Sequence, residues 1–162
     1  MCDYSLMAVP NRLAREGEAL VVHRFPTGSL GLASPESVRR KAAADRPRRS
    51  GWLATVFEFF SPPAVEAVCA VCVPPGARLP LYDIPPRLQL EGNAGACAEV
   101  TFTQLTAAAH MYRDAVRFAN GREVRLQELK EGQRVRVLDL SGAGEPDLTA
   151  LYEENRRMLL QR

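Results

Sequence analysis

The sequence of 162 residues contains no long hydrophobic run and carries almost no net charge. A membrane-spanning helix needs about 20 consecutive apolar residues, and no stretch approaches that length. The start of the chain also lacks the basic and apolar regions of a secretory signal. The formal net charge of +2 is too small to favour a nucleic-acid-binding protein, because such binding needs a concentrated basic surface. We therefore expect a cytoplasmic protein with no membrane association and no nucleic-acid partner.

Cysteine and histidine are both scarce. Four cysteines in a chain of this length are too few for a disulfide scaffold, and a reducing compartment would keep them as thiols. The two histidines, His23 and His110, have no motif spacing to the cysteines, so no zinc-finger or metalloprotease pattern is present. Metal or redox roles for the cysteines are therefore favoured over structural disulfides.

Most segments with a clear residue pattern are β-like. Apolar residues make up 46% and charged residues 25% of the chain, which is the composition of a globular protein. The β-like segments are residues 18–33 (two strands around a turn), 65–73 (a central strand buried on both faces), 98–105 and 134–140. The sequence thus predicts a mainly β fold.

The sequence around Asn120 and Gly121 predicts a further hairpin. A two-residue turn at this point would set Val116 opposite Arg125, which mismatches an apolar with a charged residue. A three-residue loop with Gly121 in the left-handed conformation sets Val116 opposite Val124 instead. The apolar pattern therefore favours the three-residue loop.

Two segments interrupt the β pattern. Residues 35–63 form a basic and aromatic insertion, with a helix start, a basic run over residues 39–49, and Trp52 with three phenylalanines over residues 52–60. Residues 141–162 read as a hinge followed by an amphipathic helix. We predict one β-rich domain over residues 1–140, a small antiparallel barrel or half-barrel with an inserted helical segment, followed by this C-terminal helix.

Cys2 is the residue of this chain whose position allows the most chemistry. If Met1 is removed, Cys2 presents both a thiol and an α-amine whose pKa is ordinarily about 8. Together they can chelate a metal, or act as a nucleophile with its own base. The polar neighbours Asp3, Tyr4 and Ser5 could orient the sulfur. Such a donor set suits nickel, copper or iron, and does not suit calcium or magnesium.

The other cysteines and the histidines are weaker candidates. Cys69 and Cys72 lie three apart in a predicted strand, so their side chains point to opposite faces and both read as buried small apolar residues. Cys97 lies at a junction of loop and strand. His23 shares a strand face with Val21 and Phe25. Either His23 or His110 could reach Cys2 in space, so both are candidate metal ligands.

Three function hypotheses follow. The first is a cytoplasmic transition-metal-binding protein with a site built around a processed Cys2 and with His23 or His110 as a further ligand. The second is an enzyme in which Cys2 is the catalytic nucleophile and attacks an amide or thioester. The third is an interaction module that binds a partner, or a second copy, through residues 52–60 or the C-terminal helix.

Three parts of the chain are similar to a known group of proteins. They are residues 1–6 (MCDYSL), residues 22–28 (VHRFPTG), and residues 113–118 with the sequence that follows through Val135. In these parts the chain resembles a group of small bacterial proteins, and this implies a shared fold without supplying site residues. The Met1-Cys2 opening is also similar to that of the hydrogenase-maturation chaperones, and Cys2-Asp3 to the nickel hook of nickel superoxide dismutases. These two likenesses are analogies to an N-terminal metal-binding cysteine.

Overall fold

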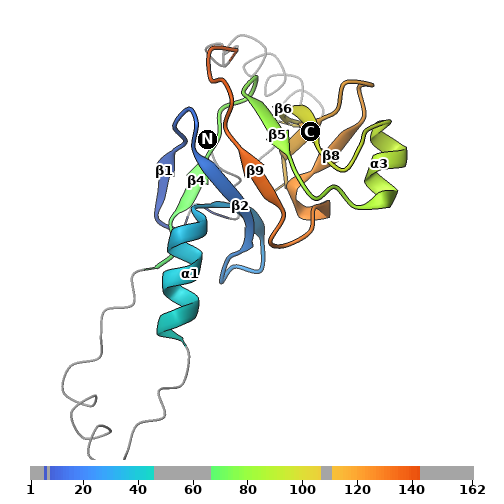
Figure 1. The fold of residues 1–162 in the computed structure, drawn as a ribbon. Helices are drawn as coiled ribbons and strands as arrows, with labels where there is room; N and C mark the ends of the chain where they lie inside the picture. Colours follow the sequence, from blue (N-terminus) through green and yellow to red (C-terminus); the bar gives the residue numbers. More distant parts are fainter. Residues whose placement is uncertain (1–5, 7, 46–66, 107–110, 143–162) are drawn as a thin grey trace, which may run out of the picture.

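The protein folds around one curved, mixed sheet of nine strands that forms a half-barrel (Figure 1). The computed structural model describes residues 6, 8–45, 67–106 and 111–142. Its strands are β1 (Asn11–Leu13), β2 (Ala19–Arg24), β3 (Leu30–Ala33), β4 (Ala70–Cys72), β5 (Arg78–Leu81), β6 (Ala98–Gln104), β7 (Asp114–Arg117), β8 (Glu123–Arg125) and β9 (Arg134–Arg136). Its helices are α1 (Pro35–Ala44), α3 (Pro86–Gly92) and the 3₁₀ turn η2 (Leu126–Glu128). The predicted mainly β half-barrel is confirmed.

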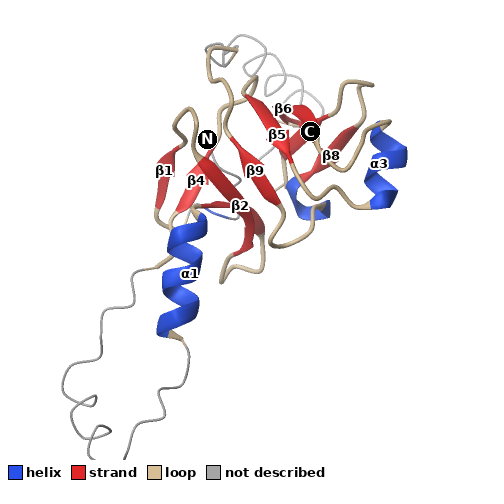
Figure 2. Ribbon diagram, viewed as in Figure 1, coloured by secondary structure: helices blue, strands red, loops and turns tan. Residues whose placement is uncertain are grey.

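The strand order is β1-β4-β3-β2-β9-β5-β6-β7-β8. The two ends of the sheet are joined through β9, which pairs with β2 on one side and with β5 on the other. Figure 2 shows α1 beside the end that holds β1 to β4, and α3 beside the end that holds β5 to β8. We call these the N-terminal end (β1-β4-β3-β2) and the C-terminal end (β5-β6-β7-β8) of the sheet.

Local sequence accounts for the hairpin and for the first helix. The β7–β8 hairpin sets Val116 opposite Val124, and Gly121 has a φ of +86°, so the predicted three-residue loop is confirmed. Helix α1 starts directly after Ser34, where Pro35 fits the first helical turn because its missing N–H would have no partner there. The predicted helix start is thus also confirmed.

The predicted strand over 65–73 is shorter and lies elsewhere in the sheet than expected. Its described core is β4, whose three residues are all buried, as the apolar run predicted. The expectation that this strand is central is wrong, because β4 is second from the edge and pairs in parallel with β1. The edge strand β1 reads Asn-Arg-Leu and has no apolar alternation, so its presence could not be predicted.

The apolar side chains form two clusters. The larger spans both ends of the sheet and contains Leu20, Leu79, Phe102 and Val116 among its fully buried members. The smaller is confined to the N-terminal end, and Val38 of α1 packs against it. We call it the second cluster, and its members are Leu6, Val9, Phe25, Ala33, Val68 and Ala70.

Two predicted features fall outside the described residues: the aromatic segment 52–60 and the C-terminal helix within 141–162. Both stay predictions. Among the described helices, none has the length and apolar character that crossing a bilayer requires.

Candidate functional site

The second cluster lies on the face of the sheet that carries His23 and Cys72. Ala33 of β3 pairs with Ala70 of β4, so both side chains point to the same face. Cys72 lies two residues after Ala70 and Gly31 two residues before Ala33, so they share that face because side chains alternate along a strand. His23 pairs with Gly31 across the β2–β3 hairpin and lies on the same face as well. We call this surface the N-terminal face.

Gly31 leaves room on this face for the Leu6 side chain, and we call this position the seat of Leu6. Leu6 is only 2% exposed, and a Cβ placed on Gly31 would lie 2.6 Å from the Leu6 Cδ1 atom. The Leu6 side chain thus occupies the space that any other residue at position 31 would fill. The Val9 amide donates to the Leu6 carbonyl at 3.0 Å and turns the chain toward β1. Leu6 therefore lies over the residue that pairs with His23.

His23 is held in a partly dry environment. Its side chain is 17% exposed, and its ring meets the Phe25 ring edge to face at a centroid distance of 5.0 Å. Burial lowers the pKa of His23. The Glu131 carboxylate, 4.0 Å from the His23 Nδ1 atom, opposes this shift, and Lys41 adds to it. The result favours neutral imidazole, which is the form that binds a metal or accepts a proton.

The cysteines differ in their chemical state. Cys72 is 6% exposed and disulfide-bonded, whereas Cys69 and Cys97 are free. The expectation of four thiols therefore does not hold at Cys72. The expectation that Cys69 and Cys72 do not act together agrees with this result, since they are not joined to each other. Cys69 is half-buried, and it lines a hollow of about 390 Å³ together with Pro10, Ser37, Arg40 and Ala67.

Of the predicted metal ligands, only His23 lies in the described part of the chain. Cys2 and His110 are both outside it. Within the described residues, no group of three or more histidine, cysteine, aspartate or glutamate side chains is arranged to hold a metal ion. A metal site that uses His23 must therefore draw further ligands from beyond the described residues.

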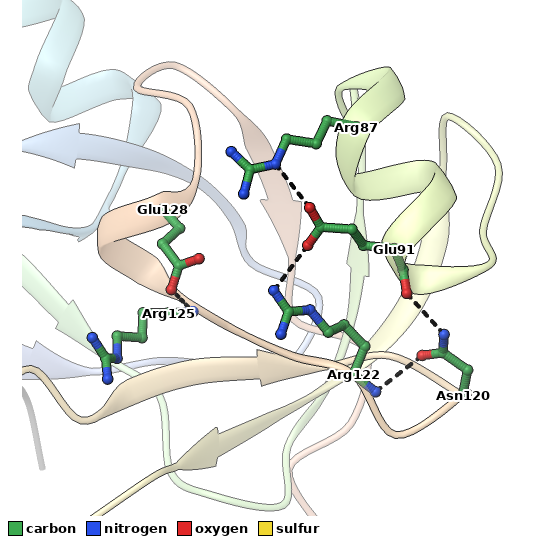
Figure 3. A network of polar contacts seen from close by, with 6 residues as sticks. All are labelled: Arg87, Glu91, Asn120, Arg122, Arg125 and Glu128. Atoms are coloured by element: carbon green, nitrogen blue, oxygen red, sulfur yellow. Dashed lines mark hydrogen bonds and ion pairs between the residues drawn. The ribbon is translucent and has the colours of Figure 1, made fainter.

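A polar network at the C-terminal end is the other dense cluster of functional groups (Figure 3). Glu91 of α3 accepts from Arg87 Nε and from Arg122 Nη2, each at 2.8 Å, and the Asn120 side chain donates to the Glu91 carbonyl at 3.0 Å. These contacts lower the pKa of Glu91, with the Arg87 hydrogen bond as the largest cause. Since Glu91 of α3 contacts both Arg122 and Asn120, the network ties α3 to the β7–β8 hairpin.

Sequence reasoning missed two features of the N-terminal face. Glu131 is 108 positions from His23 and reaches it only because β9 pairs with β2. Cys72 shares a face with His23 only through the register of three strands. Neither fact leaves a local signal in the sequence, although the alternation in β2 did place His23 on the side of Val21.

Comparison of the chain with protein-family models, with curated proteins and with solved structures finds no match. Its function must therefore be inferred from its own residues.

Proposed function

We propose that the protein binds a transition metal at a site formed by Cys2 and His23 on the N-terminal face. The observation that carries the proposal is the seat of Leu6 over Gly31, which is paired with His23. Cys2 precedes Leu6 by four residues, and a chain of four residues spans at most about 14 Å. A link of this length allows the Cys2 sulfur to reach the His23 imidazole, which supports the proposal.

The chemistry of the two groups selects the class of metal. A thiolate and a neutral imidazole suit nickel, copper or iron, and they suit calcium or magnesium poorly. The lowered pKa of His23 leaves its imidazole unprotonated at neutral pH, so a metal ion does not have to displace a proton there. If Met1 is removed, the α-amine of Cys2 adds a third donor. His110 is a further candidate.

Elemental analysis and intact-protein mass test the proposal on protein expressed with nickel, copper, iron and zinc supplied. We expect close to one equivalent of metal in the wild-type protein, a loss to background in Cys2→Ser, and a clear reduction in His23→Gln. Cys97→Ser is the matched control, because Cys97 is a free, exposed thiol at the other end of the sheet. Metal content that is absent from the wild type, or unchanged in Cys2→Ser, would overturn the proposal.

A further inference from the structure

The disulfide at Cys72 has a consequence for Cys2. The sequence contains four cysteines, at positions 2, 69, 72 and 97. Cys69 and Cys97 are free, and Cys72 is disulfide-bonded. Within one chain, Cys2 is thus the cysteine left to pair with Cys72. We propose that Cys2 and Cys72 form a redox pair, which is a disulfide when oxidised and supplies two sulfur ligands to the metal when reduced.

The register of the sheet supports this pairing. The antiparallel register that sets Ala33 opposite Ala70, continued by two residues, sets Cys72 level with Gly31. Leu6 lies over Gly31, so Cys72 and His23 flank the seat of Leu6 from β4 and β2. Neighbouring strands are about 4.8 Å apart, which places the backbones of these two residues about 10 Å from each other.

The reach of the N-terminal segment fits as well. A disulfide needs Cα atoms about 4.4–6.8 Å apart. The four-residue link from Leu6 to Cys2 is longer than the distance between adjacent strands, so Cys2 can approach β4 while Leu6 stays seated. Cys69 is a poorer partner for Cys72, because residues three apart in an extended segment point to opposite faces.

The redox step balances with a small-molecule disulfide, such as glutathione disulfide, as the oxidant. The Cys2 thiolate attacks one sulfur of that disulfide and releases one small thiol, and the Cys72 thiolate then displaces the second. One S–S bond breaks and one forms, and the two electrons leave with the two small thiols. A dithiol reverses the reaction. The disulfide-bonded sulfurs carry no thiolate charge, so the oxidised protein cannot offer them as metal ligands.

The part of the inference that concerns metal rests on the proposed function, whereas the pairing itself can be tested without metal. The full-length protein is treated with glutathione disulfide, alkylated under denaturing conditions, digested without reduction, and its peptides are identified by mass. We expect a Cys2–Cys72 linked pair, with alkyl groups on Cys69 and Cys97. A link from Cys72 to Cys69 or Cys97, or an alkylated Cys72, would overturn the pairing.

The variants are chosen so that a failure to fold cannot be mistaken for a lost disulfide. Cys72 is buried, and Cys72→Ser could fail to fold, so Cys2→Ser is the main variant. In Cys2→Ser we expect Cys72 to become alkylated, whereas in Cys97→Ser the Cys2–Cys72 link should persist. A Cys72 that stays linked within the Cys2→Ser chain would contradict the proposal.

A nickel titration of the reduced and the oxidised protein separates the two proposals. If the redox pair binds the metal, the reduced protein should bind about one equivalent of nickel and the oxidised protein none. A mapped Cys2–Cys72 link without binding of nickel in either state, and without binding of copper or iron in the same titration, would overturn the proposed function and leave the pairing standing. Equal binding in both states would overturn the role of the pair as metal ligand, while a Cys2-dependent metal content would still support the proposed function.

Discussion

The two ends of the sheet use their polar residues differently. Arginines pair with carboxylates on the solvent side at both ends, as Arg117 does with Glu123 and Arg12 with Glu18. At the N-terminal end, His23 and Cys72 lie over a small apolar cluster that also seats Leu6. The N-terminal end thus adds two less hydrated groups to the charged pairs that both ends carry. These are the groups that the proposed metal site uses.

The largest expected difference is between the two apolar clusters, one shared by both ends and one confined to the N-terminal end. Phe102 belongs to the large cluster and Phe25 to the second cluster, and both are almost completely buried. We expect Phe102→Ala to lower the free energy of unfolding by about 3–5 kcal/mol, and Phe25→Ala to fall at or below the lower end of that range, because the smaller cluster can collapse around the loss. Urea denaturation measures both. An equal or larger cost at Phe25 would show that the second cluster is as essential as the first.

Alanine substitutions at two glycines compare how well each end of the sheet tolerates an added methyl group. A Cβ at Gly92 would lie 2.7–3.0 Å from three atoms of the Phe118 ring, which is rigid and buried. A Cβ at Gly31 would lie 2.6 Å from the Leu6 Cδ1 atom, which is the end of a flexible side chain, and 3.1 Å from the nearest atom of the Phe25 ring. We expect Gly92→Ala to cost about 1–3 kcal/mol, and Gly31→Ala to cost less while it displaces Leu6.

Thermal unfolding measures the stability of both glycine variants, and their metal content gives a second readout. Gly31→Ala should weaken metal binding more than Gly92→Ala does, although its effect on stability is smaller. A Gly31→Ala protein with normal metal content would contradict the role of the Leu6 seat.

The pH dependence of stability distinguishes the ends through His23. Its pKa is lowered by burial in the folded protein, so the unfolded chain binds a proton more readily. The stability that neutral His23 contributes is therefore complete above the ordinary histidine pKa of about 6.5, and it is lost as the pH falls below that value. We expect His23→Gln to flatten the stability profile in this range. Urea midpoints between pH 7.5 and pH 5 test this, and an unchanged slope in the variant would contradict it.

The smallest expected effects come from the surface ion pairs. Hydrogen bonding to Arg12 lowers the pKa of Glu18, and hydrogen bonding to Arg134 lowers the pKa of Asp83. Each carboxylate therefore contributes stability above its ordinary pKa of about 4, and this is lost as the pH falls below that value. We expect Arg12→Ala to cost at most about 1 kcal/mol at pH 7, and Arg134→Ala to have less effect because its pair is more exposed.

Denaturation at pH 7 and pH 3 measures both arginine variants. The difference between each variant and the wild type should shrink at pH 3. A cost at Arg134 that persists there would show that its side chain stabilises the fold by packing and not by charge.

Short sequence patterns predicted the elements whose formation depends on a few neighbouring residues. The β2–β3 pair, strand β6, the start of α1 and the loop at Gly121 were all readable, because apolar alternation, a proline and a left-handed glycine act over a few residues. β5 and α3 were not predicted. Each is short, and prolines lie within β5 and at the start of α3, where a β-like pattern is weak.

The candidate site could be predicted only as a set of chemical types. The sequence singled out Cys2 for its place next to Met1 and for its polar neighbours, and His23 and His110 as the two imidazoles of the chain. It could not show that Cys72 shares a face with His23, since that depends on the register of β2, β3 and β4. Pairing of strands distant in sequence is set by the packing of the whole sheet.

X-ray absorption at the metal K-edge of the reduced, nickel-loaded protein tests most directly whether the N-terminal face binds a metal. We predict that the atoms nearest the nickel include sulfur and imidazole nitrogen, and that Cys2→Ser loses a sulfur neighbour while Cys97→Ser keeps the wild-type spectrum. A wild-type spectrum with only oxygen and non-imidazole nitrogen neighbours would contradict a site built from Cys2 and His23.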